Sequence, residues 1–176
     1  HPSLLPKLRG PAPIQGSILG LGEPGVSIIK MDALMDHGPL LIKEEVPINP
    51  FPDHYAIVEE KLARAGARLL IKVLPEYLSG TLNLEAQDDN EATFIKLIRK
   101  EDGLINLESN PEENYRKVLA YSTWPGAYIF FKRKTGDDIR VVIKNAKIEN
   151  DHFIPLRVIP AGKKEMSWED FLRGNA

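Results

Sequence analysis

An apolar stripe between Val58 and Val73 is the strongest structural signal in this 176-residue chain. Its members recur every three or four residues, which places them on one face of a helix: Val58, Leu62, Ala65, Leu69 and Val73. Asp53 precedes the stripe as a candidate N-cap, and Pro75 and Gly80 follow it, so we expect a helix over 53–74. Such a one-sided helix needs a sheet or another helix to cover its apolar face.

The segments before this helix supply only two strands. Residues 1–10 are expected to be loop, a short helix follows from Ile14 to about Leu21, and the stretches 25–31 and 40–46 have strand composition. Two strands alone make a marginal sheet. We therefore expect residues 1–80 to complete a larger α/β sheet whose other strands precede His1, in a chain cut from a longer protein.

The second half of the sequence alternates in charge and becomes β-rich. Residues 81–115 carry nine acidic and three basic side chains and predict an extended connector that ends in a helix from about Pro111. A hairpin is expected from 127–132 and 139–144, with further short strands at 147–148 and 153–159 and a helix capped by Ser167. This pattern predicts a small OB-like β-barrel, with domains at 1–80 and 81–176.

Composition excludes several classes of site. Because the chain has no cysteine, it cannot contain a disulfide, a thiolate zinc site or a cysteine nucleophile. Its apolar runs are far shorter than the roughly 20 residues of a membrane span, and no secretory leader is evident. We therefore expect no membrane partner and a cytoplasmic location.

Common catalytic motifs are also missing from the sequence. The glycines between 16 and 25 match neither a dinucleotide fingerprint nor a P-loop, and Ser3 lies in no G-x-S-x-G elbow. His37 has no second ligand at metal-binding spacing, so we expect no metal site.

Two residues remain as candidates for acid–base chemistry. His1 opens a proline-bounded loop and can exchange protons near neutral pH, although a terminal histidine is more often simply solvated. Asp36 lies in a turn beside His37 and Gly38, where it could orient an imidazolium, although turn chemistry alone explains an aspartate there.

A local excess of positive charge marks the hairpin region. Residues 116–147 carry eight basic and two acidic side chains, although the whole chain has a net charge of −2. Lys132, Arg133 and Lys134 are expected at the hairpin tip beside Tyr128, Phe130 and Phe131. There the cations could contact nucleic-acid phosphates and the aromatic rings could stack on bases. A solvated turn over a buried aromatic core explains the same residues, and we expect Phe130 to be buried in that core.

At these residues the sequence resembles the methionyl-tRNA formyltransferase family. The segments 1–6 and 9–15 resemble the family's active-site loop, and 25–32 with 35–38 resemble its strand and Asp-Thr-Gly turn. The resemblance continues through Gln87-Asp88, Ala92-Thr93 and 100–103, and the blocks 124–128 and 162–174 distinguish the tRNA enzyme from other folate formyltransferases.

The resemblance implies roles for particular residues. His1 and Asp36 correspond to the catalytic pair, and the family's catalytic Asn, two positions before the His, lies outside this chain. The tetrahydrofolate cleft corresponds to Ser3, Leu4, Leu5 and Pro6. For tRNA binding we expect Arg9, Lys132, Arg133, Lys134, Arg140 and Lys144. His37 stands where the family has Thr, and Pro39 where it has an acidic or small residue, which affects the surroundings of Asp36.

The resemblance also implies an activity. The expected reaction transfers a formyl group from 10-formyltetrahydrofolate, as co-substrate, to initiator methionyl-tRNA, in a monomeric protein without a metal. We expect this chain alone to be inactive. The alternatives are a formyltransferase that acts on a sugar nucleotide and a non-catalytic RNA-binding remnant.

Overall fold

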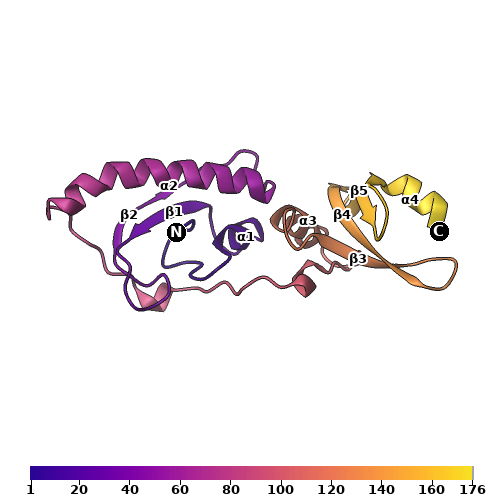
Figure 1. Cartoon of the computed structure of the whole chain (residues 1–176), viewed down its shortest axis with the longest axis horizontal. Coiled ribbons are helices and arrows are strands. Elements are labelled where there is room, and N and C mark those ends of the chain that lie inside the picture. Colours follow the sequence, from indigo (N-terminus) through magenta and orange to yellow (C-terminus); the bar gives the residue numbers. More distant parts are fainter. Residues whose placement is uncertain (176) are drawn as a thin grey trace. The chain divides into compact units, whose positions relative to one another are not determined.

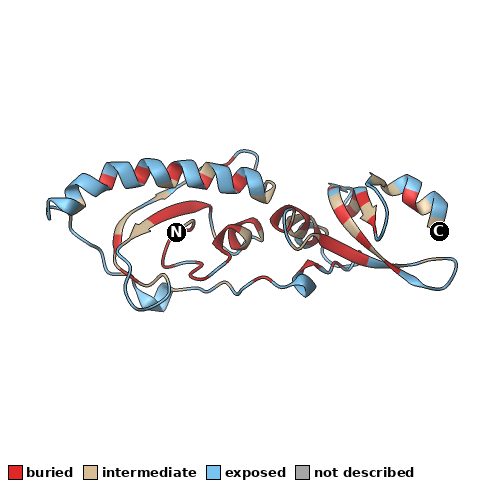
Figure 2. Ribbon diagram, viewed as in Figure 1, coloured by how far each residue is buried: buried red, intermediate tan, exposed pale blue. Residues whose placement is uncertain are grey.

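The amphipathic helix is α2 (Tyr55–Leu78), the longest element of the computed structural model, which describes residues 1–175. All five stripe residues are buried, and Figure 2 shows them as regular red bands along α2. The expected cap is wrong: Asp53 accepts the His54 N–H, and His54 is the N-cap without a side-chain bond. Pro75 lies inside the last turn, where it removes the hydrogen bond to the Ile71 carbonyl, and the helix nevertheless continues to Leu78.

A two-stranded antiparallel sheet lies under α2. The strands are β1 (Gly25–Ile29) and β2 (Leu40–Glu45), paired with Ser27 opposite Lys43, and the short helix α1 (Pro13–Ile18) also contacts α2. These three elements occur where the sequence predicted them. The apolar stripe of α2 thus covers the sheet that presents the residues described below (Figure 1).

The chain divides into two compact units, the first from His1 to Leu97 and the second from Ile98 onward. The acidic connector belongs largely to the first unit. Glu85 exchanges two backbone hydrogen bonds with Leu40. The Ile95 N–H donates to the Arg9 carbonyl at 2.8 Å. Because residues 81–97 pack in this way, the boundary between the two units falls after Leu97, later in the sequence than the expected position at residue 80.

The second unit is a four-stranded antiparallel sheet with two flanking helices. In chain order it contains α3 (Pro111–Ala120), β3 (Ala127–Lys132), β4 (Asp138–Glu149), β5 (His152–Pro160), β6 (Met166–Ser167) and α4 (Trp168–Asn175). The separate strand expected at 147–148 is wrong, because β4 runs unbroken through it. The OB-like barrel is not confirmed: within residues 1–175 the strand order is β3-β4-β5-β6, and no β3–β6 pairing closes it.

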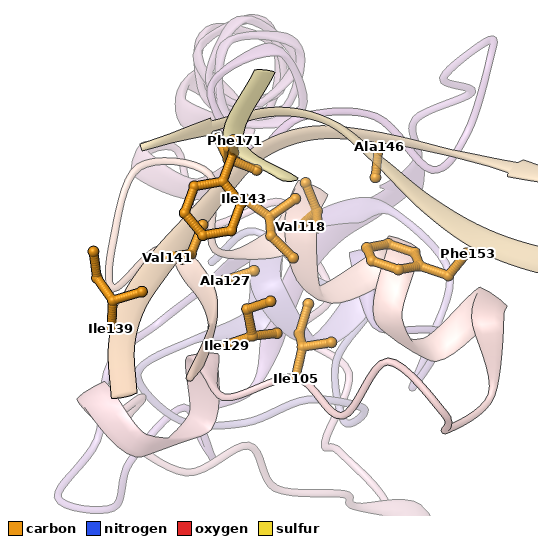
Figure 3. Packing of buried hydrophobic residues seen from close by; sticks show 11 residues of the cluster. Ile105, Val118, Ala127, Ile129, Ile139, Val141, Ile143, Ala146, Phe153 and Phe171 are labelled. Atoms are coloured by element: carbon orange, nitrogen blue, oxygen red, sulfur yellow. The ribbon is translucent and has the colours of Figure 1, made fainter. Parts of the chain in front are cut away.

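The core of the second unit lies between the sheet and its helices. Val118 from α3 and Phe171 from α4 pack onto inward-facing residues of β3 and β4 (Figure 3). Phe131 extends this cluster: the centroid of its ring lies 5.0 Å from that of Phe171 and 6.1 Å from that of Trp168. One face of the sheet is therefore covered. No helix among the described residues is both long and apolar enough to span a membrane.

Candidate functional site

His1 and Asp36 come together in the first unit. The His1 backbone exchanges two hydrogen bonds with Ser27 of β1, each 2.9 Å long. The ring Nε2 lies 3.1 Å from the Leu8 carbonyl oxygen, and Nδ1 lies 3.4 Å from Asp36 Oδ1. A carbonyl only accepts, so Nε2 carries a proton in this contact, and Nδ1 faces a carboxylate. The arrangement therefore suits a ring that gains and loses a proton at Nδ1.

The turn that presents Asp36 is held by its backbone and by one carboxylate bond. Asp36 has a left-handed conformation with φ 52°, which aspartate tolerates better than most residues. Its Oδ2 accepts the Gly10 N–H at 2.7 Å. A Cβ at Gly38 would lie 1.9 Å from the Lys30 carbonyl oxygen, so only glycine fits there. One carboxylate oxygen is thereby fixed while the other faces His1.

Gln87 links this turn to Arg9. Its amide nitrogen donates to the carbonyls of Asp36 at 2.9 Å and Gly38 at 2.7 Å. Its amide oxygen accepts hydrogen bonds from Nε and Nη2 of Arg9. Arg9 Nη2 also donates to Asp89 at 2.9 Å. Sequence reasoning noted Gln87 only as part of a motif, because no local pattern reveals a bond across 51 residues. Gln87 is thus a positioning residue for Asp36.

The position of Arg9 argues against the direct tRNA contact predicted for it. Its side chain is only 4% exposed, and its guanidinium is engaged by Gln87 and Asp89. A phosphate could reach it only after these bonds are broken. Arg9 instead has a structural role in this unit.

His37 joins two carboxylates beside the same turn. Its Nδ1 lies 2.7 Å from Asp32 Oδ2, and its Nε2 lies 3.4 Å from Asp89 Oδ2. The Asp32 hydrogen bond raises the pKa of His37, while His37 lowers the pKa of Asp32 and the Arg9 guanidinium lowers that of Asp89. His37 therefore links the Asp36 turn to Asp32 and Asp89 through charged hydrogen bonds.

A cavity of about 450 Å³ opens at the His1–Asp36 pair. Apart from Ser27, its other walls are apolar and come from β1 and the following loop: Ile28, Ile29, Met31, Leu34 and Met35. A second cavity of about 300 Å³ reaches His1 from the side of α2. Volumes of this order are typical of small-molecule sites. The pair is therefore accessible to a ligand with an apolar ring.

The segment predicted to line the folate cleft lies behind this cavity. Ser3, Leu5 and Pro6 are buried, Leu4 is half-buried, and none of the four is among the lining residues. Ser3 Oγ donates to the Lys7 carbonyl at 2.6 Å, so its polar group is already used. This bond fixes the conformation of the loop that follows His1, and folate contacts by these four residues stay a prediction.

The predicted tRNA residues of the second unit differ in their surroundings. Lys132 and Lys134 are exposed, whereas Arg133 pairs with Asp137 and lowers the pKa of that carboxyl to about 2. The Arg140 guanidinium lies 4.0 Å from the centre of the Tyr128 ring. Lys144 Nζ lies 3.4 Å from the Ser122 carbonyl. The expectation for Phe130 is wrong: it is 60% exposed, because it points away from the core side of β3.

Comparisons with known proteins identify the family of this chain. Residues 1–74 match the family model described as formyl transferase, and residues 97–155 match formyl transferase, C-terminal domain. A methionyl-tRNA formyltransferase from Chloroflexus aggregans is 42% identical over 133 residues, covering 75% of this chain and 43% of that protein.

Two solved structures add to these relatives. A 4-N formyltransferase from Francisella tularensis has a TM-score of 0.68 at 26% identity, over 84% of this chain and 62% of that one. HypX from Aquifex aeolicus, in complex with tetrahydrofolic acid, has a TM-score of 0.71 at 16% identity, over 98% of this chain and 34% of that one, and shows a shared fold. The chain spans about half the length of the curated relatives that it matches.

Proposed function

The chain belongs to the methionyl-tRNA formyltransferase family, and from this premise we propose that it serves formyl transfer from 10-formyltetrahydrofolate to the amino group of initiator methionyl-tRNA. The observation that carries the proposal is the approach of His1 Nδ1 to within 3.4 Å of Asp36 Oδ1 at the mouth of a cavity. The family supplies the reaction class, and the pair supplies the groups that can move the proton.

The cavity suits the ring system of a folate. Its apolar walls, from Ile28 to Met35, can contact a flat heterocycle, and its one ionisable edge is formed by His1 and Asp36. When bound, 10-formyltetrahydrofolate supplies the formyl group. We propose that a folate in this cavity lies with that group beside His1 and Asp36.

His1 and Asp36 divide the proton chemistry between them. As the amine nitrogen bonds to the formyl carbon, the bond from that carbon to the folate nitrogen breaks and tetrahydrofolate leaves. The His1 imidazole is placed to accept the proton that the amine loses, as a general base, and to return it to the departing folate nitrogen. The Asp36 carboxylate then stabilises the imidazolium by its charge and holds the orientation of the ring. The bonds from Gly10 and Gln87 keep the carboxylate in place for both roles.

The basic residues of the second unit are proposed to bind the tRNA backbone. Lys132 and Lys134 are exposed and available to phosphates, and Arg140 keeps an exposed part beside Tyr128. Such contacts release counterions, so affinity should fall with rising salt concentration. An alanine triple variant of Lys132, Arg133 and Lys134 should therefore bind tRNA more weakly and with a smaller salt slope.

A chimera tests the catalytic proposal. The matching part of the Bacillus licheniformis methionyl-tRNA formyltransferase, which is 36% identical over 195 residues, is replaced by this chain. Formylation of methionyl-tRNA is then measured. We expect activity in the chimera and a loss of about 10²–10⁴-fold in kcat for His1→Asn and Asp36→Asn.

The controls separate substrate choice from loss of the site. His54→Gln, at the N-cap of α2, should leave kcat unchanged. A folded chimera in which His1→Asn keeps full activity would contradict the assignment. Activity on a nucleotide-linked amino sugar in place of methionyl-tRNA would favour the sugar-nucleotide alternative, in line with the Francisella tularensis neighbour.

A further inference from the structure

The β3–β4 hairpin has one face turned to the core and one turned to solvent. Ala127, Ile129 and Phe131 contribute to the core, so strand alternation places Tyr128, Phe130 and Lys132 on the opposite side. The strand register sets Arg140 of β4 directly opposite Phe130. We call Tyr128, Phe130, Lys132 and Arg140 the outer hairpin face.

An aromatic pair lies at the centre of this face. The rings of Tyr128 and Phe130 meet edge to face, with centroids 5.7 Å apart and an interplanar angle of 88°. Tyr128 is buried beneath its neighbours, whereas Phe130 is 60% exposed. The contact with Tyr128 restricts how the Phe130 ring can turn. One large aromatic surface is therefore held against the sheet and left open to solvent.

A hollow of about 410 Å³ borders Phe130. Leu104 and Ile105 contribute apolar surface to it, and Asn106, Ser109 and Lys117 contribute polar groups. A flat ring that lies on Phe130 can thus reach hydrogen-bonding groups at its edge. Glu113 also lines the hollow and disfavours a purely anionic occupant.

The charge around Phe130 is predominantly positive. Arg140 stacks on Tyr128 with its guanidinium 4.0 Å from the ring centre. Lys132, two residues after Phe130 on the same face of β3, is exposed. Asp138 lies opposite Lys132 and partly offsets it. Along the sequence, residues 116–147 carry eight basic and two acidic side chains. An aromatic surface with cations beside it matches a nucleotide, whose base is flat and whose phosphate is anionic.

We propose that the outer hairpin face binds an unstacked nucleobase of an RNA, with the base on Phe130 and the adjoining phosphates on Arg140 and Lys132. The identity of the partner as RNA rests on the proposed function. The sheet face itself resembles other single-strand binding surfaces, in which bases stack on strand aromatics between basic residues. The sequence favoured a buried Phe130 over one that stacks on a base, and its exposure reverses that preference.

The test uses the full chain and two fluorescent octamers of equal phosphate number, oligoadenylate and an abasic oligomer. Fluorescence anisotropy gives Kd for the wild type, Phe130→Ala, Phe130→Leu and Phe130→Trp. Stacking is sequence-tolerant but needs a π-face, so we expect Phe130→Ala and Phe130→Leu to bind oligoadenylate about 5- to 100-fold more weakly. The tryptophan variant should bind it as tightly as the wild type, and the abasic oligomer should not distinguish the four proteins.

Controls distinguish this inference from the proposed function. Phe94→Ala removes an aromatic side chain that is 67% exposed in the first unit, and it should leave both affinities unchanged. The alanine triple variant of Lys132, Arg133 and Lys134 should weaken both oligomers and reduce the salt slope, whereas Phe130→Ala should keep the slope of the wild type.

Two results would overturn the inference. If Phe130→Ala binds oligoadenylate as tightly as the wild type while the triple variant binds it weakly, the base-stacking site is wrong and the phosphate contacts stand. If the wild type binds neither oligomer nor tRNA, the RNA-binding part of the proposed function fails together with the inference.

Discussion

The two units of this chain use charged side chains in opposite ways. In the first unit, Arg9 is almost fully buried and its guanidinium is shared between Gln87 and Asp89. In the second, Lys132 and Lys134 are exposed on a hairpin, and Arg140 rests on an aromatic ring. A cation whose donors are used inside the fold positions neighbouring groups, whereas a cation with open donors is available to a partner. The amount of charge in a segment does not distinguish the two cases.

Removal of Arg9 should produce the largest effect on stability. Arg9→Ala leaves the Gln87 amide oxygen and the Asp89 carboxylate without their shared donor, and it opens space in a buried site. We expect the free energy of unfolding to fall by about 2–4 kcal/mol, measured by urea denaturation. Arg68→Ala is the control, since the exposed pair of Arg68 on α2 with Glu44 on β2 should contribute less than about 1 kcal/mol. Equal effects for both variants would remove the distinction between the units.

A smaller loss is expected at Gln87. Gln87→Ala removes the two bonds to the Asp36 turn and the two that its amide oxygen accepts from Arg9, which keeps Asp89 as a partner, so the free energy of unfolding should fall by about 1–3 kcal/mol. Amide exchange in residues 33–38 should accelerate at the same time. Gln15→Ala in α1, for comparison, should change neither quantity. If exchange in this segment stays at the wild-type rate, Gln87 does not position Asp36.

The His37 network should give the smallest effect, visible in its pH dependence. The pKa of His37 is raised by Asp32, so its contribution to stability is complete below the ordinary histidine pKa and disappears as pH rises through the raised value. The pKa values of Asp32 and Asp89 are lowered, so their contribution is lost as pH falls below the ordinary carboxyl range. The melting temperature of this unit should be highest at mildly acidic pH.

Substitution of His37 checks the sign of this dependence. His37→Gln should remove the loss of melting temperature on the alkaline side, while His152→Gln in the second unit should leave the curve as in the wild type. Thermal melts at a series of pH values measure both. A wild-type curve that rises steadily through the histidine range would contradict the network.

Local patterns in the sequence predicted most of the secondary structure. The helix α2 follows from its apolar periodicity, and the β3–β4 hairpin follows from two runs of β-branched and aromatic residues around a turn. Each of these patterns lies within one continuous segment. The barrel was expected from the number of short strands, but closure depends on whether distant strands pair, and β3 and β6 do not. Strand number alone does not determine that pairing.

The site was predictable in part. The resemblance to a family pointed to His1 and Asp36, which the structure brings to 3.4 Å. It could not show that Arg9 is buried or that Gln87 holds the turn, because these bonds join residues 51 or more positions apart. The exposure of Phe130 was missed for a related reason: the run from Ala127 to Phe131 is apolar on both faces, so its sequence does not say which face is covered.

Hydrogen exchange of the full chain with and without tRNA tests the contrast between the units most directly. If exposed cations bind and buried ones position, tRNA should slow exchange in the segment 128–144 and leave the segment 85–95, which surrounds Arg9, at its free rate. The opposite pattern, with protection around Arg9 and none in the hairpin, would contradict the division of roles between the two units.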